Sequence, residues 1–258
     1  AAECSQVDRA AELREMSRIA KKVTGDAPET FREALQLIWF VYQAIHVEGH
    51  GYSCTPDRID QLLLPFYEAD RQAGRIGDEE VLRLVENFVL KQYDNSFWGP
   101  EHHLTQGLCV SGSTPDGEDL TNRLSWLFVE GHTNLSLPEP LLWVRWHPNI
   151  DQEFLDFCLA RLEQSSCFPM YWNDNAIPDA LMELGMDRQD AFNFVPVGCN
   201  ELAVPGQWYY NPGAHVGYLQ AIEATVTSGK GYRGQWRSRE VAPPTTELKN
   251  FDQFADAV

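Results

Sequence analysis

The sequence has no long hydrophobic run of the kind found in proteins that enter or cross a membrane. No apolar stretch approaches the roughly 18–20 residues that a membrane-spanning helix needs. Residues 1–24 have the pattern of a charged amphipathic helix and lack the apolar segment of a signal peptide. We therefore predict a cytoplasmic protein without a membrane partner.

Basic residues are also scarce. The chain of 258 residues carries 20 Lys and Arg against 38 Asp and Glu, a formal net charge of −18 at pH 7. Such a charge opposes binding to phosphate backbones and to anionic lipid surfaces. The composition therefore argues against nucleic acid and membranes as partners.

Cysteine pairs and metal-binding motifs are missing. The six cysteines form no C-x-x-C pair, which argues for reduced thiols; they are Cys4, Cys54, Cys109, Cys158, Cys167 and Cys199. His46 and His50 flank Glu48 at helical spacing, but no third ligand follows at a motif distance. We predict no metal site.

What the sequence does have is ample material for a deep core and a regular alternation of elements. Apolar residues make up 43% of the chain, including eight Trp and thirteen Phe. Periodicity predicts four helices before residue 95 and alternating strands and helices from residue 104 onward. The predicted helices cover 1–22, a segment ending near 47, 58–73, 78–93, 119–131, 151–164, 177–184, 214–228 and 251–258. The predicted strands cover 104–111, 141–146, 167–172 and 195–199, and the alternation indicates an α/β fold with a parallel sheet. Pro196 makes the last segment unsuitable as an ordinary central strand, so we predict an irregular strand there that runs into a loop.

The stretch from Val195 to Glu201 combines a thiol with a carboxylate. An apolar run ends in Gly198, and Cys199 follows, with Glu201 two residues on. In an extended backbone, residues i and i+2 point to the same side, so one small substrate could touch both side chains within one closed pocket. The alternative is that Cys199 is a small, inert core residue, as free cysteines often are.

Five stretches of the chain carry recognisable motifs in a fixed order. They are 33–40 (EALQLIWF), 58–70 (with RIDQ, LPFY and a final Asp), 107–125 (with DGED and LS), 173–174 (ND) and 198–201 (GCNE). Together they resemble the glycyl radical enzymes, the pyruvate formate-lyase-like family. The resemblance implies a ten-stranded α/β barrel, built from two five-stranded parallel half-barrels, wrapped by helices and forming a homodimer. It places residues 1–258 within one barrel domain, with a helical layer over about 1–95 and the cysteine loop within 96–258.

The resemblance also implies an anaerobic radical mechanism. A glycine near the C-terminus of these enzymes holds a backbone radical that a separate activating enzyme installs with S-adenosylmethionine and an iron–sulfur cluster. Nothing in this sequence matches the RV-x-GY radical loop, so the resemblance implies an internal portion of a longer chain, inactive by itself and with no cofactor bound. Cys199 is the implied thiyl residue, and Glu201 takes a proton from the substrate hydroxyl. Ser53 is an implied substrate contact, and Tyr52 stands where the family often has a histidine.

The sequence departs from the family pattern at several positions. Asp57 stands at the usual glycine of GR-x-DQ, and Asn200 stands at the usual valine beside the cysteine. Cys167 stands where the family often has a glycine before the Pro of the strand that leads to ND. Gly213 stands where some dehydratases carry an Asp. The family histidine is absent at position 52 and the dehydratase Asp is absent at position 213, and three aromatic residues, 208–210, lie nearby in the sequence. These differences suggest a pocket unlike that of glycerol dehydratase.

Several functions remain open at this point. The resemblance favours a lyase or dehydratase that cleaves a C–O or other C–heteroatom bond. A radical decarboxylase of aryl acetates also uses a Cys-x-Glu pair, whereas acyl transfer of the formate-lyase type is disfavoured because Asn200, not a second cysteine, follows Cys199. Outside the family, Cys199 could act with His215 as a cysteine hydrolase, or the chain could be a non-catalytic relative.

Overall fold

The structure is a computed structural model that describes residues 7–49, 53–96, 105–165, 168–199, 201–209, 218–227 and 249–257. The chain divides into two compact units, residues 1–210 and 211–258. The assignment of all 258 residues to one barrel domain stays a prediction.

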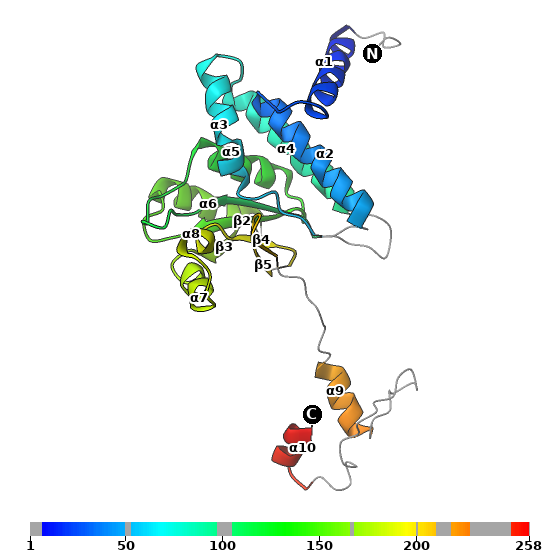
Figure 1. The fold of residues 1–258 in the computed structure, drawn as a ribbon, viewed down its shortest axis with the longest axis vertical. Coiled ribbons are helices and arrows are strands. Elements are labelled where there is room, and N and C mark those ends of the chain that lie inside the picture. Colours follow the sequence, from blue (N-terminus) through cyan, green and yellow to red (C-terminus); the bar gives the residue numbers. More distant parts are fainter. Residues whose placement is uncertain are drawn as a thin grey trace. The chain divides into compact units, whose positions relative to one another are not determined.

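Four helices make up the N-terminal part of the first unit. They are α1 (Val7–Val23), α2 (Phe31–Gly49), α3 (Ile59–Gln72) and α4 (Asp78–Ser96). Helical spacing predicted their positions to within a few residues, because each buries a stripe of apolar side chains. On α4 the stripe includes Val81, Val85 and Val89, all fully buried. Figure 1 shows α2 and α4 running alongside each other above the sheet.

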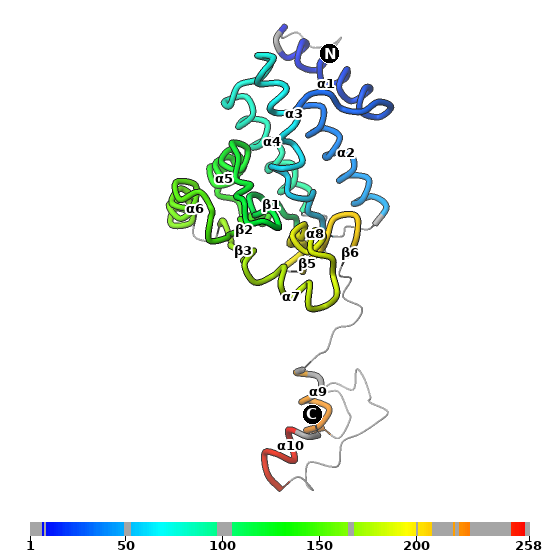
Figure 2. The backbone as a smooth tube through the Cα atoms, turned by 60° about the vertical axis from the view of Figure 1, so that its left-hand side comes forward, coloured from blue at the N-terminus to red at the C-terminus, as the bar shows by residue number. Residues whose placement is uncertain are grey.

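A three-stranded parallel sheet follows in the order β1, β2, β3. The strands are β1 (Gly107–Ser111), β2 (Leu141–Trp146) and β3 (Met170–Asn173), and the crossover helices are α5 (Arg123–Leu135) and α6 (Gln152–Ser165). Cys109 pairs with Trp143, and Arg145 pairs with Trp172. The predicted α/β class with a parallel sheet is confirmed. Figure 2 shows α5 and α6 beside these strands.

The two faces of the sheet have different partners. Leu108, Val110, Leu142 and Val144 belong to the main core with the helices. The alternate residues Cys109, Trp143 and Arg145 are equally buried but point the other way, as the two-residue period of a strand requires. We call this second side the hairpin face, because the chain packs a β-hairpin on it.

The hairpin belongs to a second, antiparallel sheet of β4 (Val195–Val197), β5 (Glu201–Val204) and β6 (Trp208–Tyr209). The short helices α7 (Ile177–Glu183) and α8 (Arg188–Ala191) lie between β3 and β4 in the chain. The predicted irregular strand is present at Val195–Val197, but its expected place in the parallel sheet is wrong. Pro196 lacks an amide hydrogen, and Gly198 turns the chain back with φ +61°, so the segment forms a tight hairpin instead.

Helix α5 begins four residues later than predicted. The Asn122 side chain accepts a hydrogen bond from the Leu124 amide at 2.9 Å, and the Asn122 amide donates to Ser125 Oγ at 3.0 Å, so the helix starts after residue 122. Asp119 lies before the helix and accepts hydrogen bonds from the amides of Thr121 and Asp151. It thereby ties the loop after β1 to the start of α6.

Two carboxylates of the second motif hold neighbouring elements of the first unit together. Asp60 is fully buried and accepts hydrogen bonds from the Ser111 amide at 2.7 Å and from Ser125 Oγ at 2.5 Å. Burial raises the pKa of Asp60 to about 6. Asp70 accepts from the Phe31 amide at 2.8 Å and so caps α2. These motif residues fix the frame around the site.

The second unit contains α9 (Tyr218–Val226) and α10 (Phe251–Ala257), both close to their predicted positions. None of the helices in the described part of the chain is both long enough and apolar enough to cross a membrane.

Buried His132 predicts a pH dependence of stability. Its Nε2 lies 2.6 Å from the Pro140 carbonyl oxygen, and burial lowers the pKa of His132 to about 4. The unfolded chain binds this proton near pH 6.5, whereas the folded chain does not, so the free energy of unfolding falls as the pH drops from about 6.5 to about 4. The slope from this one group is at most about 1.4 kcal/mol per pH unit.

The measurement is urea unfolding of the wild type and of His132→Gln at several pH values. Glutamine can still donate to the Pro140 carbonyl but does not titrate, so we expect the stability difference between the two proteins to change across this window and to be constant above pH 7. A constant difference at every pH would contradict the burial of a neutral imidazole.

Candidate active site

The thiol and the carboxylate lie at the end of the β4–β5 hairpin. Val197 pairs with Glu201 across the hairpin, and Cys199 occupies the turn between them. The expectation that Cys199 and Glu201 point to the same side of one extended strand is therefore wrong, because the chain reverses between them. Their closeness comes from the turn itself.

The Glu201 carboxylate folds back over Gly198. A Cβ atom built on Gly198 would overlap Oε2 of Glu201 and would lie 3.6 Å from Cβ of Ser53. Ser53 and Glu201 thus reach the same point above the turn, although 148 positions of sequence separate them. Glycine is needed at 198 twice over, for its positive φ and for the space that the carboxylate fills.

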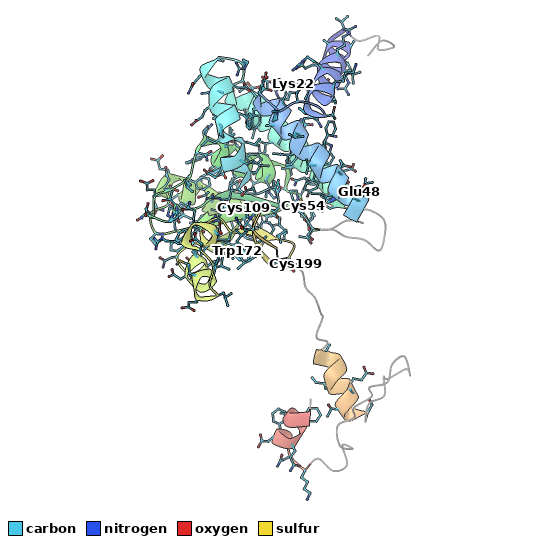
Figure 3. The ribbon with its side chains drawn as sticks, in the orientation of Figure 1. Lys22, Glu48, Cys54, Cys109, Trp172 and Cys199 are labelled. Carbon is cyan, nitrogen blue, oxygen red and sulfur yellow. The ribbon has the colours of Figure 1, made fainter. Side chains whose placement is uncertain are left out.

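Cys199 is exposed in this structure, whereas the sequence argument expected a thiol in a closed pocket. Figure 3 shows Cys199 at the edge of the first unit and Cys109 inside it. The apolar residues before Cys199 do not enclose it, because Val195 and Val197 turn their side chains into a cluster with Cys109 and Ala203. That cluster seats the hairpin on the hairpin face of the sheet and leaves the turn uncovered.

The other described thiols, of which Cys109 and Cys158 are buried and Cys54 is half-buried, stay protonated. Burial raises the pKa of Cys54 to about 11 and that of Cys158 to about 12, and it also raises the pKa of Cys109. All four described cysteines are free. Among these four, Cys199 is the one with an exposed side chain.

Several predicted site positions lie outside the described residues. Tyr52, the second proposed substrate contact, is one of them, and so is His215, the partner in the hydrolase hypothesis. Asn200, Gly213 and Cys167 are others. The roles predicted for these positions stay predictions.

Asp57 shows why the family favours glycine at its position. Its φ is +52°, in the left-handed region that glycine adopts readily and that Asp tolerates better than most residues. The Asp57 carboxylate accepts a hydrogen bond from the Arg58 amide at 2.6 Å, which supports this conformation. The substitution therefore preserves the turn that leads from Ser53 into α3.

A buried ion pair next to the hairpin was not assigned a role from the sequence. Arg145 on β2 and Asp174 after β3 form two parallel hydrogen bonds of 2.8 Å and are both buried. The signal was present in the sequence, because Arg145 interrupts an otherwise apolar strand and Asp174 belongs to the ND motif. Neither observation alone pairs the two residues or places them next to the segment that leads into the hairpin.

The described residues contain no group of three or more His, Cys, Asp or Glu side chains arranged to hold a metal ion. His46 Nε2 lies 2.9 Å from Gln106 Nε2, inside the protein. Its possible partner His50 is not among the described residues.

Comparison with known proteins gives the chain a family. A family model described as pyruvate formate lyase-like matches residues 1–258. The chain belongs to the pyruvate formate lyase-like family. This confirms the resemblance drawn from the motifs, and a glycyl radical enzyme of Archaeoglobus fulgidus is among the solved structures with this fold.

Members of the pyruvate formate lyase-like family that resemble this chain include dehydratases and a lyase. The probable dehydratase YbiW of Escherichia coli is 29% identical, over 95% of this chain and 32% of the relative. The isethionate sulfite-lyase of Desulfovibrio desulfuricans is 28% identical, over 96% of this chain and 31% of the relative. The glycerol-bound B12-independent glycerol dehydratase of Clostridium butyricum matches with a TM-score of 0.81 and 30% identity, over 98% of this chain and 33% of that structure. The chain therefore spans about a third of the length of these relatives.

Proposed function

We propose that this chain is the cysteine-bearing part of a glycyl radical lyase or dehydratase, in which Cys199 abstracts a hydrogen atom from a small substrate and Glu201 handles the proton. The observation that carries the proposal is the hairpin on the sheet face opposite the helices. It presents Cys199 at its turn and brings Glu201 and Ser53 together above Gly198. In a closed barrel this face would be the interior.

The proposal includes the architecture that the family implies. Strands β1 to β3 would be three of the five parallel strands of one half-barrel, and the remaining strands would close a ten-stranded barrel around the hairpin. Closure would enclose the sulfur that is exposed in the described structure. The complete protein would form a homodimer in the anaerobic cytoplasm and would be activated by a radical S-adenosylmethionine enzyme.

The site fits a one-electron role for the sulfur. Cys199 lies exposed at the hairpin turn, and a relay between a radical donor and a substrate requires a sulfur that both can reach. When present, the glycyl radical would supply the oxidising equivalent that removes the hydrogen atom from the Cys199 thiol. The Cys199 sulfur would then form an S–H bond with the hydrogen of the substrate C–H bond and leave the unpaired electron on that carbon.

Glu201 would complete the elimination. Its carboxylate takes the proton of the hydroxyl on the radical carbon, which becomes a carbonyl as the neighbouring C–O or other C–heteroatom bond breaks. Glu201 returns the proton to the departing group, so a hydroxyl leaves as water. The Cys199 thiol returns its hydrogen atom to the product carbon, and the cycle closes without net oxidation. Ser53 and Tyr52 would hold the substrate hydroxyl groups.

The test uses the full-length protein, activated anaerobically and offered glycerol, propane-1,2-diol, isethionate and 4-hydroxyphenylacetate. We expect a dehydrated carbonyl product, or sulfite from isethionate, only after the glycyl radical is seen by electron paramagnetic resonance. Protein without activation is the control. Decarboxylation of 4-hydroxyphenylacetate alone, or turnover without a radical, would replace the proposal with the decarboxylase or the hydrolase hypothesis.

A further inference from the structure

We propose that the buried Arg145–Asp174 pair is a positioning device that sets where the Cys199 hairpin stands. The proposal rests on the proposed function of Cys199 and names residues that act through the hairpin without touching the substrate. The guanidinium group of Arg145 joins three segments of the chain: its own strand β2, the residue after β3 and the segment that leads into β4.

Arg145 donates two hydrogen bonds to the segment that leads into β4. Its Nη2 donates to the Phe192 carbonyl at 2.9 Å and its Nη1 donates to the Phe194 carbonyl at 3.0 Å. The guanidinium carbon lies 4.1 Å from the centre of the Phe194 ring, so the cation also stacks on that residue. Phe194 directly precedes β4, and the turn residue Cys199 follows five positions later.

Asp174 fixes the guanidinium from the other side. Its two oxygens accept from Nε and Nη2 of Arg145, each at 2.8 Å. Oδ2 also accepts from the Ser113 amide at 2.8 Å and from Ser113 Oγ at 3.2 Å. A Cβ on Gly112 would lie 3.0 Å from Arg145 Nε, so the loop after β1 closes tightly on the pair. The carboxyl ends of β1, β2 and β3 are thereby locked together around one cation.

A second arginine holds the same segment. Arg58, at the start of α3, donates from Nη2 to Oδ1 of Asn193 at 3.2 Å. Residues 192, 193 and 194 are thus each held by an arginine that belongs to another element. Because β4 has only three residues, a shift of this segment carries over directly to the turn.

Stability alone does not account for such an arrangement. A buried ion pair gains little over apolar residues of similar size, because both charges lose their hydration. What the bidentate geometry adds is a fixed direction, since the planar guanidinium accepts few orientations of its partners. Lysine keeps the charge, but its three N–H donors cannot replace the four hydrogen bonds that Arg145 makes to Asp174 and the two carbonyl groups, so Arg145→Lys is the informative change.

The first arm of the experiment follows hydrogen–deuterium exchange in the full-length protein before activation. For Arg145→Lys we expect faster exchange of the amides of Val195, Val197 and 201–204, with unchanged exchange at the amino end of β1, at Gly107 and Leu108, and in α4. The matched control is Arg75→Lys, because Arg75 donates to the buried carboxylate of Asp70 far from the hairpin, at 2.7 Å. Faster exchange throughout the sheet would show a general structural role and overturn the proposal.

The second arm measures turnover after activation. For Arg145→Lys we expect kcat to fall about 100-fold, as for a catalytic group misplaced by about 1 Å, with KM and the glycyl radical signal nearly unchanged. Unchanged kcat would overturn the positioning role while leaving the proposed function intact. If the wild type itself shows no radical-dependent turnover, the proposed function fails and the exchange arm alone decides the positioning role.

A second variant covers the case in which Arg145→Lys does not fold. Asp174→Asn keeps the shape of the side chain but removes its charge and leaves only one oxygen to accept from Arg145. We expect several-fold faster exchange of the Val195 and Val197 amides in this variant, and exchange equal to that of the wild type would overturn the proposal.

Discussion

Replacing Cys199 with alanine in the full-length protein abolishes turnover, by at least about 10⁶-fold, and leaves the glycyl radical signal intact. The size follows from the role, because without the sulfur no group accepts the hydrogen atom of the substrate, and enzymes commonly accelerate their reactions by this factor or more. Cys199→Ser gives the same result, since a serine O–H bond is much stronger than a thiol S–H bond. Product formation and electron paramagnetic resonance are measured on the same sample.

The control for this change is Cys158→Ala. Cys158 is fully buried in the main core on α6 and has no part in the proposed chemistry. We expect this variant to keep its turnover and to lose some stability from the small cavity. Residual turnover in Cys199→Ala above that of the unactivated protein would remove Cys199 from the mechanism.

Glu201→Gln lowers the rate of elimination by at least about 100-fold, the usual scale of general acid–base catalysis. Glutamine has almost the same shape and can still lie over Gly198, but it cannot take a proton. We expect kcat to fall and the radical signal to persist. The rate is measured as carbonyl product formed per radical.

Gly198→Ala provides a matched change at the same point. A Cβ there overlaps the Glu201 carboxylate and strains a φ of +61°, so the carboxylate must move while its chemistry is kept. We expect a loss comparable to that of Glu201→Gln. A near-normal rate in both variants would show that Glu201 takes no proton during turnover.

The helices and the parallel strands could be predicted because their signals are local. The apolar stripe of α4 has the period of a helix, and the continuous apolar run of β2 is typical of a strand that is buried on both faces. The hairpin could not be predicted in this way. Val195 to Val197 has the composition of a buried strand, and only its antiparallel pairing with Glu201 to Val204, set by the turn at Gly198, shows that it lies outside the parallel sheet.

The candidate site was predicted only where its signal is local in the sequence or carried by the family resemblance. Cys199 and Glu201 are near neighbours in the sequence, so a motif finds them, and Ser53 came from the family resemblance. The Arg145–Asp174 pair was missed because its effect depends on two backbone carbonyl groups, at Phe192 and Phe194, and no side-chain pattern marks a carbonyl that receives a hydrogen bond. Exposure of Cys199 was missed because neighbouring apolar residues do not reveal which way they point.

The most direct test of the thiyl role is electron paramagnetic resonance of the activated full-length protein, rapidly frozen with its substrate. The substrate carries ¹³C at the carbon that loses hydrogen. The account predicts a carbon-centred radical broadened by ¹³C in the wild type and only the glycyl signal in Cys199→Ala. A ¹³C-broadened signal of equal intensity in Cys199→Ala would contradict it.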